Sequence, residues 1–136
     1  STKLSCICSV WNLSSCFENL GIPRRIPKNV ILSKNTLKND IKKSNICFYR
    51  GSTSSITALQ DGVYPIYLNL NKTLNIDPLY SMKFWKTEIN NINDFDRFIS
   101  KELLYKFGEI QKQAKAVNFS KKYFVKFNKL NFLRLL

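Results

Sequence analysis

The chain has 136 residues and a formal charge of +13, from 22 basic and 9 acidic side chains, and it contains no histidine. This length predicts a single domain with a real hydrophobic core, and the apolar runs are too short to span a bilayer. The absence of histidine excludes Ser-His-Asp and Cys-His catalysis. The chain starts at Ser1 without a methionine or a recognisable signal peptide, as a piece of a longer protein would.

The positive charge has two interpretations. A polyanionic partner such as nucleic acid is one of them. The other is a compositional bias, because lysine, asparagine, isoleucine and phenylalanine are all abundant, as an AT-rich coding sequence would produce. The basic residues are spread along the chain, which favours the compositional explanation.

The four cysteines, Cys6, Cys8, Cys16 and Cys47, form no Cys-x-x-Cys pair. Zinc sites usually need such paired spacing, so we expect no structural metal. Cys6 and Cys8 would share one face of a strand, which fits use as small buried side chains. Reduced cysteines predict a cytoplasmic location.

The first third of the chain predicts short elements. Residues 4–10 and 30–32 read as strands, and residues 14–20 as a short helix that ends before Gly21. Two prolines make residues 23–28 a connector. Thr36 is a good cap for one turn of helix that leads into the centre of the chain.

The central stretch, Ile46 to Leu68, carries the clearest pattern. An apolar strand runs up to Tyr49 and is followed by Gly51, which permits a tight turn. The next residues are hydroxyl side chains suited to cap a helix, and Gly62 ends that helix. A second β-rich run follows from Val63. Two strands joined through a helix predict a right-handed βαβ unit. The strand ends and the start of the helix would lie at one edge of the sheet, where backbone N–H groups and the helix dipole favour the binding of an anion such as phosphate.

The remaining residues predict a loop and one long helix. Residues 69–80 read as a loop, in which Asp77 has an ordinary turn role before a proline. Residues 82–89 are ambiguous, with a short strand around Trp85 as one interpretation. Apolar spacing predicts a long helix that starts at Asn93 or Asp94 and runs to residue 117. Residues 119–136 alternate aromatics with lysines and contain no acidic residue.

These elements predict an α/β protein. We expect a Rossmann-like three-layer domain with a short parallel sheet and C-terminal helices. The expected organisation is a Rossmann-like domain over residues 1–117 and a basic, aromatic C-terminal helix over residues 118–136, which packs on or beside it.

Residues 46–68 resemble the donor-binding half of GT-B glycosyltransferases, in which a strand, a turn rich in glycine and serine, a helix, a glycine closely followed by a proline, and a second strand succeed one another. In this chain the pattern is carried by Tyr49-Arg50-Gly51-Ser52-Thr53-Ser54, by Ala58 and by Gly62-Val63-Tyr64-Pro65-Ile66. The resemblance extends more loosely to residues 29–45 and to the C-terminal helices.

The resemblance implies that the turn holds the diphosphate of a nucleotide sugar, which is a substrate rather than a cofactor. The implied donor-binding residues are Arg50, Gly51, Ser52, Thr53, Ser54 and Thr57. Thr57 stands where many members of the family have a glutamate that binds the sugar or the ribose. The resemblance identifies no catalytic residue and no metal ligand.

The resemblance also implies a role in surface polysaccharide biosynthesis. GT-B catalysis occurs in a cleft between two domains, so an N-terminal acceptor domain or a partner chain would have to supply the other half. The enzyme would be cytoplasmic, or peripheral at the inner face of the membrane. A shortened enzyme without activity is a variant of this hypothesis.

The alternative hypothesis is a non-catalytic basic module that binds nucleic acid or an anionic membrane surface. Its support is the acid-free C-terminal stretch, in which lysines such as Lys121 and Lys122 alternate with aromatic residues such as Tyr123 and Phe124. Packing of these aromatics on the domain is the commoner use of such a stretch and makes nucleic acid the less favoured partner.

Overall fold

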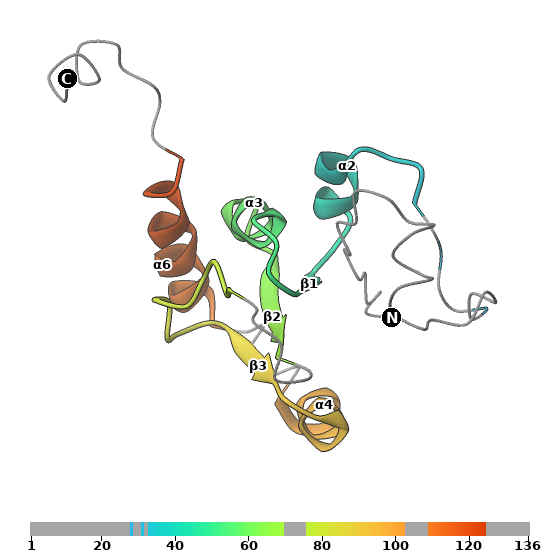
Figure 1. The fold of residues 1–136 in the computed structure, drawn as a ribbon. Coiled ribbons are helices and arrows are strands. Elements are labelled where there is room, and N and C mark those ends of the chain that lie inside the picture. The colour runs from blue at the N-terminus through green and yellow to red at the C-terminus, as the bar shows by residue number, and fades with distance from the viewer. Residues whose placement is uncertain (1–27, 29–30, 32, 70–75, 103–108, 125–136) are drawn as a thin grey trace, which may run out of the picture.

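The computed structural model describes residues 28, 31, 33–69, 76–102 and 109–124 (Figure 1). The described elements combine helices with the strands of a parallel sheet, as expected for an α/β protein. In chain order they are α2 (Leu37–Lys42), β1 (Ile46–Tyr49), α3 (Ser54–Gln60), β2 (Tyr64–Leu68), β3 (Thr87–Ile89), α4 (Ile92–Arg97), the π-helical segment Phe98–Glu102 and α6 (Ile110–Lys121). The predicted small α/β, Rossmann-like fold with a short parallel sheet is confirmed.

The sheet has three parallel strands in the order β1-β2-β3. Tyr49 at the end of β1 lies opposite Tyr67 of β2, which in turn lies opposite Glu88 of β3. Because side chains alternate between the faces of a strand, these three residues form one row on one face. The row crosses the sheet near the carboxyl ends of β1 and β2.

The other face of the sheet is covered by aromatic rings from α4, from the π-helical segment and from Trp85, which precedes β3. The ring of Phe48 lies 5.9 Å from that of Phe95 in α4, and Tyr64 stacks on Phe98 with 6.2 Å between ring centroids. Tyr64 also meets the edge of Trp85 at 5.1 Å. These rings join the buried strand residues in one hydrophobic core.

Helix α3 packs against β1 and β2, and α6 packs against α3, so the two helices lie side by side (Figure 1). Strands β1 and β2 are almost completely buried, which explains why their sequences are continuous apolar runs. The predicted strand, helix and strand between Ile46 and Leu68 are therefore confirmed.

Gly62 ends α3 in the way that its sequence position predicts. Its φ is +77°, and its N–H donates to the carbonyl of Leu59 at 3.0 Å, while Val63 donates to Ala58 at 3.0 Å. These two bonds make a Schellman motif, which uses the last free carbonyls of the helix. Gln113 of α6 then donates from its side chain to the carbonyl of Gly62 at 2.8 Å.

The predicted cap of α2 is confirmed, because Thr36 accepts a hydrogen bond from the N–H of Asn39. The predicted start of the next helix at Asn93 or Asp94 is wrong by two or three residues. Asn91 is the cap of α4, where its side chain accepts from the N–H of Asp94 at 3.0 Å. The Asp94 carboxylate accepts in return from the N–H of Asn90 at 3.1 Å.

The single long helix predicted up to residue 117 is also wrong. Helix α4 passes into the π-helical segment, and α6 starts anew after Glu109, which has non-helical dihedrals. Gly108 precedes this point in the sequence and weakens a continuous helix. The apolar spacing predicts Ile110 and Ala114 on the buried side of this helix, but both are exposed. The buried positions of α6 are Ala116 and Ser120, whose small side chains allow close approach to α3.

The interpretation of residues 82–89 as a short strand around Trp85 is wrong in its position, because the strand is β3 (Thr87–Ile89) and Trp85 lies in the bend before it. Trp85 itself is buried and has a positive φ of 47°. The expected strand over residues 4–10, the helix over 14–20 and most of the strand over 30–32 lie outside the described residues. Residue 118, at which the basic, aromatic C-terminal helix is expected to begin, lies within α6.

Candidate functional site

The segment expected to bind the donor, Arg50 to Ser54, lies directly after β1 and leads into α3. Gly51 adopts a left-handed conformation with a φ of +65°, as the turn requires. This places the turn at the carboxyl end of β1. Ligands of parallel α/β sheets bind outside this end of the strands.

The hydroxyl groups of the turn stabilise the start of α3. The side chain of Ser52 accepts from the N–H of Ser54 at 3.3 Å and lies 2.8 Å from the Ser54 hydroxyl. The carbonyl of Ser52 accepts from both the N–H and the hydroxyl of Ser55, at 3.3 and 2.8 Å. Ser52 therefore has the capping role, and the Ser52–Ser54 pair is built into the turn.

Thr53 occupies the N-cap position but makes no capping hydrogen bond with its side chain, so its expected capping role is wrong. It is exposed, while Ser54 is buried and Ser52 is half-buried. Thr57 follows one helical turn later and is half-buried. The six expected donor-binding residues thus lie together in sequence and differ widely in exposure. An approaching anion would meet the exposed Thr53 and the half-buried Arg50 before the buried Ser54.

A group of polar side chains that the sequence interpretation did not select lies beside the last residue of β1. The Asp77 carboxylate accepts from the hydroxyl of Tyr49 at 2.8 Å, from the N–H of Leu79 at 2.8 Å and from the ammonium group of Lys86. Lys86 also donates to the carbonyl of Leu79 at 3.0 Å. We call these four residues the Asp77 cluster.

The Asp77 cluster is largely shielded from water. The side chains of Asp77 and Lys86 are only 11% and 9% exposed, and the Tyr49 side chain is buried. Lys86 follows Trp85, which packs on Tyr64 in the core. A buried ion pair needs further hydrogen bonds to offset its loss of hydration, and these partners supply them.

Tyr67 extends this polar region along the sheet. Its ring lies 5.5 Å from that of Tyr49. Burial and then the negative charges of Asp77 and Glu88 raise the pKa of Tyr67, while the Arg50 guanidinium lowers it. Arg50 is therefore close enough to act on the same row of side chains. The carboxyl edge of β1 and β2 combines a glycine turn, one arginine and two tyrosines with a carboxylate that Lys86 neutralises.

Two signals in the sequence point to the Asp77 cluster, although neither identifies the pairing. Lys86 stands between Trp85 and the strand that starts at Thr87, and a lysine between two elements that pack in the core needs an anionic partner if it is buried. The tyrosines at the ends of the two strands carry hydroxyl groups that need a partner when buried. The contact between Tyr49 and Asp77 spans 28 residues, and only the tertiary structure makes it.

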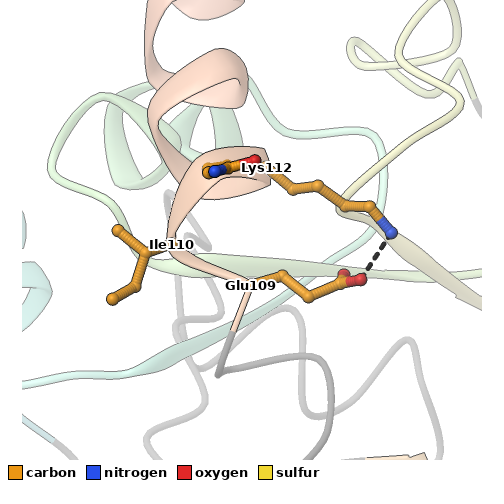
Figure 2. Close-up of a pocket in the computed structure, with 4 residues that line it drawn as sticks. Glu109, Ile110 and Lys112 are labelled. Carbon is orange, nitrogen blue, oxygen red and sulfur yellow. Dashed lines mark hydrogen bonds and ion pairs between the residues drawn. The ribbon is translucent and has the colours of Figure 1, made fainter.

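A shallow surface depression is present at the start of α6, lined by Glu109, Ile110, Gln111 and Lys112 (Figure 2). Figure 2 shows the ammonium group of Lys112 directed at the Glu109 carboxylate, and Ile110 pointing away from this pair. All four residues belong to one end of one helix. The depression therefore lacks the converging side chains of a binding site.

No family model, curated protein or solved structure matches this chain. Within the part of the chain that the structure describes, no helix is long and apolar enough to cross a membrane.

Proposed function

We propose that this chain is the nucleotide-sugar-binding half of a GT-B-like glycosyltransferase of surface polysaccharide synthesis. The observation that carries the proposal is the left-handed glycine turn at the carboxyl end of β1, with Arg50 before it and paired serine hydroxyls after it. A diphosphate needs small side chains for close approach, polar hydrogens and a cation. Arg50, Gly51 and the hydroxyl groups of Thr53 and Ser52 supply this chemistry.

The proposed role of each residue follows from its position. The Arg50 guanidinium binds phosphate oxygens, because it stands at the end of the strand and can donate two parallel hydrogen bonds. Thr53, exposed and without a capping bond, donates from its hydroxyl to the same group. Thr57 lies one helical turn further and contacts the ribose or the sugar. The Asp77 cluster holds the loop before β3 against Tyr49 and so keeps the edge of the sheet rigid.

Sugar transfer of this kind depends on orienting the donor and stabilising the leaving diphosphate. A chain with only the donor site would bind the nucleotide sugar and need an acceptor domain, in the same protein or in a partner, for turnover. The proposed location is the cytoplasm, with transfer at the inner face of the membrane, where lipid-linked acceptors lie.

The test is a calorimetric titration of the folded chain with UDP, GDP and CMP. We expect saturable binding of one nucleotide. Arg50→Gln should weaken it by at least tenfold, since a hydrogen bond to a charged group contributes about 1.5–3 kcal/mol. Thr53→Ala should weaken it less, because it removes a neutral donor.

Lys43→Gln is the matched control for loss of one charge, because Lys43 is exposed at the end of α2, outside the turn. It should leave the affinity unchanged. Thermal unfolding would verify that each variant is folded. A folded wild-type chain that binds none of the three nucleotides would disprove the proposal, and equal losses for Arg50→Gln and Lys43→Gln would show attraction to net charge only.

A further inference from the structure

The side of α6 next to Phe84, together with the turn that follows the helix, carries exposed lysines and two half-buried aromatic rings that pack on the edge of the core. We call it the basic stripe: Lys112, Lys115, Phe119, Lys122 and Tyr123. The spacings of three and four residues place Lys112, Lys115 and Phe119 on adjoining turns of one side of α6, and Lys122 and Tyr123 continue this side in the turn after the helix. The buried Ala116 and Ser120, with Gln113, form the neighbouring side that faces α3.

Ring contacts hold the lysine stems of the basic stripe against the protein. The Lys122 ammonium group lies 3.6 Å from the ring centroid of Phe119, and that of Lys115 lies 4.9 Å from Phe84. Phe84 meets Phe119 edge to face at 6.2 Å. The rings therefore place these positive charges at defined points on the surface.

The charge of this region is almost uncompensated. Glu109 pairs with Lys112, and residues 110–136 contain seven basic residues and no acidic one. Within the described residues, Lys115, Lys121 and Lys122 have no carboxylate partner. An anionic partner is the electrostatic complement of such a surface.

We propose that the basic stripe and the adjoining Phe124 dock the protein on an anionic lipid membrane. This inference rests on α6 and does not depend on the nucleotide site. Clusters of lysine and arginine on a helix bind anionic headgroups through charge, and an exposed aromatic side chain partitions into the interface. Phe124 is 54% exposed and directly follows Tyr123.

Two observations favour lipid over nucleic acid. Single-stranded nucleic acid binds by stacking bases on open aromatic faces. In the basic stripe an ammonium group covers Phe119, and Phe119 packs tilted on Tyr123 at 5.8 Å. The exposed ring of Phe124 finds no apolar partner along the phosphate backbone of duplex DNA, whereas a lipid interface accepts an aromatic side chain. The apolar side of α6 is occupied by α3, so the contact is peripheral rather than inserted.

The test is co-sedimentation of the full chain with phosphatidylcholine vesicles that contain or lack phosphatidylglycerol. We expect binding only to the anionic vesicles and a steep loss of binding with added salt. Lys115→Gln/Lys122→Gln should weaken it roughly 30-fold, because each lysine near an anionic surface contributes about fivefold. Phe124→Ala should reduce the binding that remains at high salt.

Lys38→Gln/Lys42→Gln is the matched control, since it removes the same charge from two exposed lysines of α2. It should bind as the wild type does. Lys115→Arg/Lys122→Arg keeps charge and ring contact and should retain binding even if the glutamine variant is unstable. Equal losses in the two glutamine variants would overturn the proposal. Failure of the wild-type chain to bind the anionic vesicles would also overturn it. If the chain then bound a single-stranded oligonucleotide with an affinity that depends on Lys115 and Lys122, nucleic acid would be the partner.

Discussion

Asp77 connects three parts of the chain through one carboxylate. It accepts from Tyr49 on β1, from the backbone of Leu79 and from Lys86 just before β3. A buried carboxylate with three donors stabilises the fold only while all partners are present, because each lone pair left without a donor costs free energy. Asp77 therefore determines where residues 77–86 lie on the sheet.

Removal of both members of the ion pair should cost less free energy of unfolding than the sum of the two single removals, because the second removal breaks no further pairing. Asp77→Leu leaves the Lys86 ammonium group buried without an anion, and we expect the free energy of unfolding to fall by about 3 kcal/mol. Lys86→Met should cost about 2 kcal/mol, because Tyr49 and Leu79 still donate to the carboxylate. The double variant should cost less than the sum by about 1–3 kcal/mol.

Urea denaturation of the two single variants and the double variant measures this coupling. Lys83→Met is the control, because Lys83 is exposed and close in sequence to Lys86. Strictly additive losses would contradict the buried pairing of Asp77 with Lys86.

At the scale of elements, α3 has only seven residues and depends on its ends. The serine-rich turn satisfies its first N–H groups, and the Schellman motif at Gly62 satisfies its last carbonyl groups. The side chain of Gln113 closes the same end from α6. The C-terminal end of α3 is thus also its junction with α6.

Gly62→Ala should lower the free energy of unfolding by about 2 kcal/mol. The left-handed conformation is strained for alanine by about 1–2 kcal/mol, and an added Cβ would lie 2.8 Å from Nε2 of Gln113. Gln113→Ala alone should cost about 1 kcal/mol through the lost hydrogen bond.

Urea denaturation of the double variant Gly62→Ala/Gln113→Ala separates the backbone strain at residue 62 from the clash with the Gln113 side chain. In the Gln113→Ala background, Gly62→Ala should cost only the backbone strain, because no side chain remains to clash. Gln111→Ala is the control, since Gln111 is exposed on the same helix. An unchanged stability of Gly62→Ala would show that the left-handed helix end is incorrect.

At the scale of the whole molecule, the sheet and its loop bury two tyrosines near a carboxylate. Burial and then the hydrogen bond to Asp77 raise the pKa of Tyr49, and burial followed by the charges of Asp77 and Glu88 raises that of Tyr67. The native state therefore keeps protons that the unfolded chain releases above its pKa of 10.0. The unfolded state binds fewer protons there, so stability decreases as the pH rises.

Unfolding free energies measured from about pH 8 to about pH 11 should show a decline that begins near pH 10, the ordinary pKa of tyrosine. In Tyr49→Phe/Tyr67→Phe this decline should be much shallower, although the stability at neutral pH is lower because Asp77 loses a donor. Tyr80→Phe is the control, because Tyr80 is 67% exposed, and it should retain the wild-type dependence. An unchanged decline in the double variant would assign the alkaline effect to lysines instead.

The order β1-β2-β3 also bears on the proposed site. Ligand sites of parallel sheets favour a point where the strand order reverses, and the three described strands succeed one another without a reversal. The proposed donor site therefore relies on the turn and Arg50, and the nucleotide titration tests this chemistry directly.

The sequence by itself determined the local structure of the centre of the chain. The apolar runs of β1 and β2, the turn at Gly51 and the helix end at Gly62 depend on residues adjacent in sequence, so propensity and glycine geometry suffice to predict them. The candidate site residues in this stretch came from its resemblance to a known family. The predicted contact with a nucleotide sugar stays a prediction.

Only the tertiary structure decided which distant residues meet. The Asp77–Tyr49 bond, the register of β3 and the side of α6 that faces α3 join segments far apart in the chain. Apolar spacing predicted one long helix to residue 117, whereas packing selected the small residues Ala116 and Ser120 as the buried side of a separate helix. Close packing and charge pairing depend on three-dimensional neighbours, and local sequence patterns do not contain them.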